Sequence, residues 1–195
     1  NGWSNTADMS DPYFFGYGSL VNSKTHVYQD GRPAKLSGWR RVWKRTNARD
    51  MAFLTIVPSD RTELLGLIAK VPNSDWVALD AREEGYDRLV ATEMITHDHS
   101  GNPELAIYAI PEATRFPPTP DHPILLSYLD VVLQGYLNVF GESGVQHFMD
   151  TTDGWDTVVL NDRANPIYPR AQSLSADEIS MVDQCLSKVR ATIRT

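Results

Sequence analysis

The stretch Tyr13-Phe14-Phe15-Gly16-Tyr17-Gly18-Ser19-Leu20 joins an aromatic run to two glycines at alternate positions. The aromatic part predicts a short buried strand, because apolar runs bounded by glycine are typical of strands. Glycine has no Cβ atom, so backbone N–H groups after the strand can approach an anion or a carbonyl oxygen closely. A binding loop and a simple tight turn both fit this pattern, whereas a dinucleotide fingerprint and a hydrolase elbow do not.

Strand-like segments fill the first half of the chain, and helix-like segments fill the second half. We predict strands over 34–44, 53–57, 63–70, 88–96 and 105–110, with hairpin turns at 58–62 and 98–103. We predict helices over about 74–84, with Asn73 or Ser74 as the cap and Trp76, Ala78 and Leu79 inside, then over 124–140, over 144–149 and from a capping box at Ser175. This order favours an α+β domain with a mixed, mainly antiparallel sheet.

Composition limits the class of protein. A chain of 195 residues is about one domain, and its net charge of −7 disfavours binding to phosphate backbones. The most apolar stretch, 124–140, is too short and polar for a membrane span, and the single cysteine, Cys185, fits a reducing compartment. We therefore expect a cytoplasmic protein. We expect one domain over 11–195 and a flexible N-terminal stretch over 1–10, in which Met9 is a candidate natural start.

A second motif is Leu79-Asp80-Ala81-Arg82-Glu83-Glu84-Gly85-Tyr86. Leu79 and Glu83 are four residues apart, so on a helix they share a face, whereas Glu84 points elsewhere. A carboxylate carried into an apolar cleft has a raised pKa and becomes a usable base near neutral pH. A solvated acidic helix end is the alternative.

Taken together, residues 15–20 and the Leu-Asp-x-x-Glu pattern at 79–83 resemble the γ-glutamylcyclotransferase superfamily, which includes ChaC-like enzymes and γ-glutamylamine cyclotransferases. The resemblance also includes residues 36–39 and Tyr128. It implies a barrel-like sheet with packed helices, and release of 5-oxoproline when the α-amine of a γ-glutamyl substrate attacks its own γ-carbonyl. It implies no metal or cofactor, and a small molecule as partner.

The resemblance also implies roles for individual residues. Glu83 corresponds to the catalytic acid and base. In the family the glutamate often directly precedes a glycine, so the extra Glu84 before Gly85 leaves Glu84 as the alternative base. The residues implied to bind the substrate are Phe15, Gly16, Tyr17, Gly18, Ser19, Leu20 and Tyr128.

Two other classes of function stay open. The first is a non-catalytic module of the same fold that binds a γ-glutamyl compound or another small molecule. The second, weaker hypothesis is single-stranded nucleic-acid binding through the strand 39–45, where tryptophans and arginines alternate; packed tryptophans with solvated cations are favoured there, and an arginine of this strand is a candidate for a substrate carboxylate. We interpret His97 and His99 as loop residues rather than metal ligands. The γ-glutamyl compound, the oligomeric state and the role of the chain after about residue 140 are not predicted.

Overall fold

The structure, a computed structural model, describes residues 11–195; the stretch 1–10, predicted to be flexible, lies outside the described residues. The strands are β1 Tyr13–Gly16, β2 Gln29–Lys44, β3 Phe53–Lys70, β4 Asp87–Val90, β5 Ile95–Thr96, β6 Leu105–Ala109, β7 Ile124–Leu125, β8 Thr152–Asp153, β9 Val158–Leu160 and β10 Thr192–Arg194. The α-helices are α2 Val77–Arg82, α3 Leu126–Asp150 and α4 Ala176–Lys188. Five 3-10 helices connect them: η1 Ser19–Val21, η2 Ser23–Thr25, η3 Pro72–Ser74, η4 Thr92–Met94 and η5 Glu112–Thr114.

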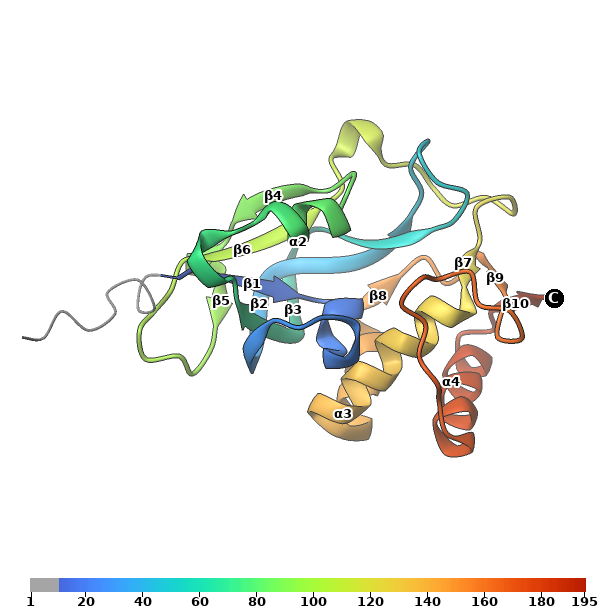
Figure 1. Cartoon of the computed structure of the whole chain (residues 1–195). Helices are drawn as coiled ribbons and strands as arrows, with labels where there is room; N and C mark the ends of the chain where they lie inside the picture. The colour runs from blue at the N-terminus through green and yellow to red at the C-terminus, as the bar shows by residue number, and fades with distance from the viewer. Residues whose placement is uncertain (1–10) are drawn as a thin grey trace, which may run out of the picture.

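The main sheet has the strand order β4-β6-β1-β3-β2-β5, with β8 beside β2 (Figure 1). Strand β1 pairs antiparallel with β3 and parallel with β6, and all four of its residues are buried. This central position explains the aromatic sequence, since a strand covered on both faces needs apolar side chains on both. The predicted α+β class with a mixed, mainly antiparallel, curled sheet is confirmed.

Strands β2 and β3 form one long antiparallel pair, so the predicted short hairpin within 53–70 is wrong. The polar residues 58–62 do not turn; they continue β3, next to a register shift between Ser37 and Trp39 of β2. Exposed strand residues are polar as well, so polarity alone does not separate them from a turn. The connection between the two strands lies instead at 45–52.

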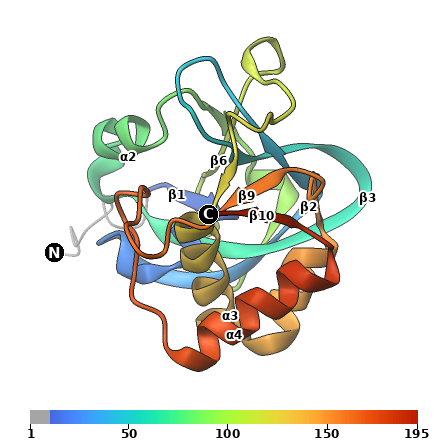
Figure 2. The same cartoon turned by 90° about the vertical axis from the view of Figure 1, so that its right-hand side faces the viewer.

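Helix α3 provides most of the helical part of the core. Every residue from Leu126 to Tyr136 is buried, which is typical of a helix covered on all sides. The chain is non-helical at Gly141, where φ is 75°, so the short helix predicted from residue 144 is the last part of α3. Figures 1 and 2 show α3 and α4 on one side of the sheet and α2 on the other, beside β4 and β6.

The other predicted elements are confirmed in part. Helix α4 begins after Ser175 with the predicted capping box, and β4 pairs antiparallel with β6, but the predicted strand 88–96 is divided, since β5 pairs with β2. Helix α2 begins later than predicted and ends at Arg82, without a side-chain cap from Asn73 or Ser74. Of its predicted inner residues Leu79 is buried, Trp76 is half-buried and Ala78 is exposed.

A second sheet with the order β10-β9-β7 is parallel throughout. In this sheet β7, which leads directly into α3, is joined by β9 and β10 from the C-terminal region (Figure 2). The chain after residue 140, for which no role is predicted, thus contains the last part of α3, strand β8 beside β2 of the main sheet, and the strands β9 and β10 of the second sheet with α4 between them.

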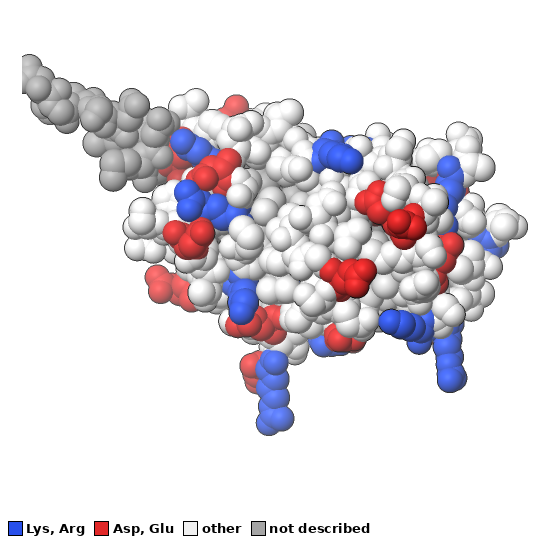
Figure 3. All heavy atoms as spheres, turned by 90° about the horizontal axis from the view of Figure 1, so that it is seen from below, with Lys and Arg blue, Asp and Glu red and all other residues white. Residues whose placement is uncertain are grey.

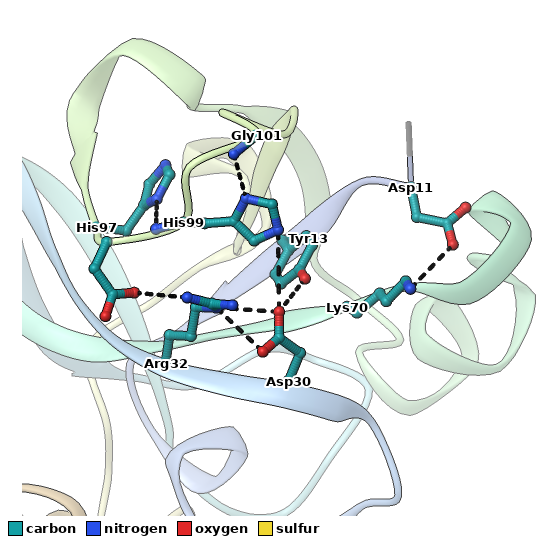
Figure 4. Close-up of polar contacts among 9 residues, drawn as sticks. Asp11, Tyr13, Asp30, Arg32, Lys70, His97, His99 and Gly101 are labelled. Atoms are coloured by element: carbon teal, nitrogen blue, oxygen red, sulfur yellow. Dashed lines mark hydrogen bonds and ion pairs between the residues drawn. The ribbon is translucent and has the colours of Figure 1, made fainter. Parts of the chain in front are cut away.

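A polar cluster lies at the start of β1, at the opposite end from its glycine (Figure 4). The Tyr13 hydroxyl donates to Asp30, and Arg32 Nε donates to both oxygens of that carboxylate at 3.1 Å. The histidines predicted as loop residues lie here, with the His99 ring 4.9 Å from the Tyr13 ring. Among the described residues no group of three or more His, Cys, Asp and Glu side chains could hold a metal ion.

Positive and negative side chains are interspersed over the described part of the surface on the α3 and α4 side (Figure 3). A mixed surface of this kind does not form the continuous basic stripe that binds a nucleic-acid backbone. None of the helices within residues 11–195 has the length and apolar character needed to cross a membrane.

Helix α3 touches the loop after β1 at Gly135. A Cβ atom there would lie 2.7 Å from the backbone nitrogen of Asn22, and the Asn22 side chain donates to Val131 O at 2.9 Å and to Gln134 Oε1 at 3.0 Å. We therefore expect Gly135→Ala to lower the free energy of unfolding by about 1–3 kcal/mol, because overpacking outweighs the gain of about 1 kcal/mol in helix propensity. Urea denaturation measures this. The control is Ser143→Ala at an exposed site of α3, which should stabilise slightly; a Gly135→Ala protein of equal or higher stability would contradict the close packing.

Candidate active site

The chain turns into η1 directly after Gly16. A Cβ atom on Gly16 would lie 2.6 Å from the Cβ atom of Leu20, and one on Gly18 would lie 3.0 Å from the Tyr128 hydroxyl. The two glycines therefore allow the loop to fold back on itself and to pass close to Tyr128. The N–H groups of Ser19 and Leu20 open a 3-10 helix and have no acceptor among residues 11–195, so both can donate to a ligand.

Glu83 is the residue that follows α2. Leu79, one turn earlier, is fully buried, and the Glu83 backbone N–H donates to its carbonyl at 3.0 Å. The neighbouring Arg82 guanidinium donates to Thr25 O at 2.7 Å and to Ser19 Oγ at 3.2 Å. Arg82 thus holds the end of α2 against the loop after β1, and Glu83 lies beside that loop.

Burial raises the pKa of the Glu83 carboxyl, since its side chain is only 17% exposed. Three guanidinium groups oppose this effect: Arg82, whose Nε lies 3.8 Å from Glu83 Oε1, and then Arg170 and Arg49. Burial has the larger effect, so the pKa stays above its usual range. A carboxylate of this kind accepts and returns a proton closer to neutral pH than an exposed one.

All eight residues predicted for the site lie around one cavity, together with three residues that the sequence did not single out. The roles of the eight stay predictions. The lining consists of Phe15, Gly16, Tyr17, Gly18, Ser19, Leu20, Leu54, Glu83, Tyr86, Tyr108 and Tyr128.

Glu84, the alternative base, is exposed and does not line this cavity. Glu84 lies beyond the last turn of α2, and the side chains of adjacent residues there point in different directions. The geometry therefore favours Glu83 over Glu84 as the carboxylate available to a bound ligand.

Tyrosines that were not predicted complete the cavity. The Tyr86 hydroxyl donates to Leu54 O at 2.5 Å, and the Tyr17 hydroxyl donates to Tyr108 O at 2.5 Å. Tyr86 is the last residue of the second motif, but no role is predicted for it from the sequence. Leu54 and Tyr108 come from β3 and β6, where nothing in the sequence separates a cavity residue from a core residue.

A second hollow adjoins the cavity at Glu83. It shares Ser19, Glu83, Tyr86 and Tyr128 with the cavity, and its other lining residues are Arg49, Phe53, Arg82, Tyr168 and Arg170. The arginines that the sequence offered for a carboxylate are elsewhere: Arg40 pairs with Asp153 at 2.8 Å, and Arg45 donates to Pro117 O at 3.1 Å.

The cavity and the hollow are narrow, with volumes of about 30 Å³ and 50 Å³. Each holds little more than water, so a larger ligand has to displace lining side chains. A wider depression of about 530 Å³ lies between α3 and α4. We assign the site by its convergent chemistry rather than by volume, because the wider depression lacks a half-buried carboxylate next to free N–H groups.

Arg41 is buried below the loop, which corrects the prediction of solvated cations on strand 39–45. Its Nε donates to Tyr17 O at 2.8 Å, and its two Nη atoms donate to Thr151 Oγ1 at 2.8 Å, Leu65 O at 2.9 Å and Tyr136 Oη at 2.6 Å. The guanidinium also lies 4.5 Å from the centre of the Phe148 ring. These contacts link the loop to β3 and to α3.

Several solved structures are similar to this chain in fold. The chain is 15% identical to a gamma-glutamyl cyclotransferase, with a TM-score of 0.54, covering 90% of this chain and 99% of that one. It is 14% identical to an uncharacterized human protein, with a TM-score of 0.53 and coverage of 89% and 99%. It is 16% identical to YkqA from Bacillus subtilis, with a TM-score of 0.53, covering 74% of this chain and 56% of that one. At these identities the likeness establishes the γ-glutamylcyclotransferase-like fold.

The family follows from the sequence. The family model described as ChaC-like protein matches residues 12–121, more than half of the chain. The protein therefore belongs to the ChaC-like family, which confirms the superfamily that residues 15–20 and 79–83 indicated. No functionally curated protein matches the chain.

The buried guanidinium predicts a loss of stability on substitution. We expect Arg41→Met to lower the free energy of unfolding by about 1–3 kcal/mol, because the Tyr17 and Leu65 carbonyls each lose a donor while buried. Chemical denaturation measures the change. The control is Arg40→Met, which breaks a half-exposed ion pair and should cost less than about 1 kcal/mol. Equal effects at the two positions would show that the Arg41 hydrogen bonds contribute no more than a surface pair.

The raised pKa of Glu83 predicts how stability depends on pH. Between the ordinary pKa of 4.5 and the raised folded-state value, the folded protein binds more protons at this group than the unfolded chain, so stability falls as pH rises. We expect Glu83→Gln to be more stable than the wild type at pH 7–8, with the difference disappearing as pH falls to 4.5. Melting temperatures over this range measure it. Glu84→Gln, at an exposed site, should show no such trend; a Glu83→Gln protein that is less stable at pH 8 would mean that the ionised carboxylate is favoured in the fold.

Proposed function

We propose that this protein is a cyclotransferase that releases 5-oxoproline from a γ-glutamyl substrate. Membership of the ChaC-like family supports this class of activity, and one solved structure with the same fold is named gamma-glutamyl cyclotransferase. The observation that carries the proposal is the position of Glu83, a half-buried carboxylate with a raised pKa at the same cavity as the glycine loop 16–20.

In the first step the Glu83 carboxylate accepts a proton from the α-ammonium group of the substrate. The free amine then attacks the γ-carbonyl carbon of the same molecule, and a bond between nitrogen and carbon closes a five-membered ring. Both reacting groups belong to one substrate, so the protein mainly has to hold a folded conformation. Phe15, Leu20 and Leu54 offer apolar surface to the methylene groups of the glutamyl chain.

The attack places negative charge on the former carbonyl oxygen. The free N–H groups of Ser19 and Leu20 are the donors available to this oxyanion. Protonated Glu83 then returns its proton to the leaving nitrogen, and the bond between carbon and that nitrogen breaks. The ring nitrogen gives up its second proton to the departing amine, so 5-oxoproline and an ammonium ion are released. Tyr128 is a substrate contact. The steps are proton transfers and one acyl transfer, so they balance without a cofactor or metal.

Replacing the proposed base tests the mechanism. We expect Glu83→Gln to lower 5-oxoproline formation from γ-glutamyl dipeptides by at least about 10²-fold, because amide oxygen does not accept the proton. Mass spectrometry of the product measures this over a panel of γ-glutamyl dipeptides and amines. The matched control is Glu84→Gln, which removes the adjacent carboxylate and should retain activity.

The opposite result, an inactive Glu84→Gln and an active Glu83→Gln, would assign the base to Glu84. A wild-type protein that binds a γ-glutamyl compound without cleaving it during long incubation would contradict the cyclotransferase and favour a binding module. Activity that is unchanged in both variants would place the base elsewhere.

A further inference from the structure

The peptide group between Ser19 and Leu20 lies at the wall of the cavity, and its two sides have different surroundings. The Ser19 carbonyl accepts from Asn22 N at 3.0 Å and from Thr25 Oγ1 at 3.0 Å. The Leu20 N–H has no acceptor among residues 11–195, and Leu20 lines the cavity. The C=O and N–H bonds of a trans peptide group point in opposite directions. The partners of the Ser19 carbonyl therefore set the direction of the free Leu20 N–H.

Thr25 is the side chain that holds this carbonyl. It is the last residue of η2, and it is buried, with 8% of its surface exposed. Its hydroxyl oxygen also lies 2.9 Å from Asn22 O. Thr25 lines neither the cavity nor the hollow beside Glu83, so it acts on a bound ligand only through the loop.

Arg82 determines how the Thr25 hydroxyl uses its proton. Arg82 Nη2 donates to Thr25 Oγ1 at 2.9 Å, and Arg82 Nη1 donates to Thr25 O at 2.7 Å. A guanidinium group only donates, so the single hydroxyl proton of Thr25 is left for Ser19 O and Asn22 O. A chain of hydrogen bonds thus runs from the Arg82 cation through the Thr25 hydroxyl to the Ser19 carbonyl, whose peptide group carries the Leu20 N–H.

This chain has an electrostatic effect on the free N–H group. Hydrogen bonds in series polarise one another, so a donor at the Ser19 carbonyl makes the N–H of the same peptide group a stronger donor. The chain begins at a cation whose side chain is only 7% exposed, where screening by salt is weak. Arg82 directly precedes Glu83, so one guanidinium links the proposed base to the Leu20 N–H.

The neighbouring free N–H group is held differently. The Ser19 N–H shares its peptide group with the Gly18 carbonyl, which accepts from Val21 N at 3.1 Å within η1. This contact is between backbone groups, whereas the Ser19 carbonyl has a side-chain donor as well. A substitution of one side chain can therefore change the Leu20 N–H and leave the Ser19 N–H as it is.

We propose that Thr25 is a positioning residue of the reaction, which directs the Leu20 N–H at the oxyanion and transmits the polarising effect of Arg82 to it. This inference rests on the proposed function, in which negative charge forms on the former γ-carbonyl oxygen. The oxyanion exists only after the attack. The Thr25 hydroxyl therefore lowers the barrier of the reaction more than it improves substrate binding.

Two substitutions separate the hydroxyl group from the volume of the side chain. Thr25→Val replaces the hydroxyl by a methyl group, whereas Thr25→Ser keeps the hydroxyl. With the γ-glutamyl compound that the wild type cleaves fastest, we expect Thr25→Val to lower kcat about 10-fold while KM changes less than about 2-fold. Thr25→Ser should keep kcat within about 2-fold of the wild type. Rates of 5-oxoproline formation over a range of substrate concentrations give both constants.

The matched control is Thr114→Val. Thr114 is also the last residue of a 3-10 helix, and its hydroxyl donates to Pro111 O at 3.3 Å, three residues earlier, as that of Thr25 does to Asn22 O. Thr114 is exposed and does not line the cavity. The control substitution should leave kcat and KM unchanged.

A Thr25→Val protein with the kcat of the wild type would overturn the proposal, and so would a rise in KM without a fall in kcat. Equal losses in Thr25→Val and Thr25→Ser would overturn it as well, since the volume of the side chain would then matter and not the hydroxyl. Melting temperatures detect misfolding. Thr25→Ala, which removes the hydroxyl without placing a methyl group there, replaces Thr25→Val if the valine protein melts below the assay temperature.

The amide resonance of Leu20 separates this proposal from the cyclotransferase itself. In the protein without substrate, we expect Thr25→Val to move the Leu20 amide proton upfield, because its peptide group is less polarised, whereas Thr25→Ser leaves it in place. An unmoved resonance in Thr25→Val overturns the positioning role, whether or not 5-oxoproline is formed. A wild type that forms no 5-oxoproline refutes the catalytic proposal, and the shift in Thr25→Val then still supports the control of the Leu20 N–H by Thr25.

Discussion

A buried cation that has no carboxylate partner within residues 11–195 lies at the centre of this protein. The Arg41 guanidinium is stabilised by the carbonyls of Tyr17 and Leu65, by the hydroxyl groups of Tyr136 in α3 and of Thr151 just after α3, and by aromatic rings. Leaving any of these acceptors unpaired away from water is costly, so the network favours a single arrangement. Tyr17 belongs to the loop 16–20, and its carbonyl is held from below while the N–H groups of the next residues face the cavity. The stability of the core and the shape of the site therefore depend on the same contacts.

The site combines segments that are distant in sequence, and its electrostatics come from their combination. The loop 16–20, the end of α2 and the start of α3 supply amides, a carboxylate and a tyrosine ring. Burial of the Glu83 carboxyl raises its pKa, whereas the nearby arginines lower it. Burial has the larger effect, so the pKa of the carboxyl group stays above its usual range.

Short-range patterns in the sequence predicted much of this arrangement. Residues of the motifs 15–20 and 79–83 lie at one cavity in the structure. Glycine spacing and a shared helical face are local features, and they are the same in the sequence pattern and in the folded protein. The polar run 58–62 was misread, since an exposed strand and a turn use the same residues. The burial of Arg41 could not be predicted, because its acceptors come from four other parts of the chain. Arg170 lies in an irregular segment with no periodicity to indicate what it faces.

The short parallel sheet has a consequence for proteolysis. Strand β10 pairs with β9, β9 pairs with β7, and β7 runs directly into the helix that carries Tyr128. A protease that cut the connection between α4 and β10 would remove one of the two neighbours of β9, and the disturbance would reach the start of α3, where Tyr128 lines the cavity.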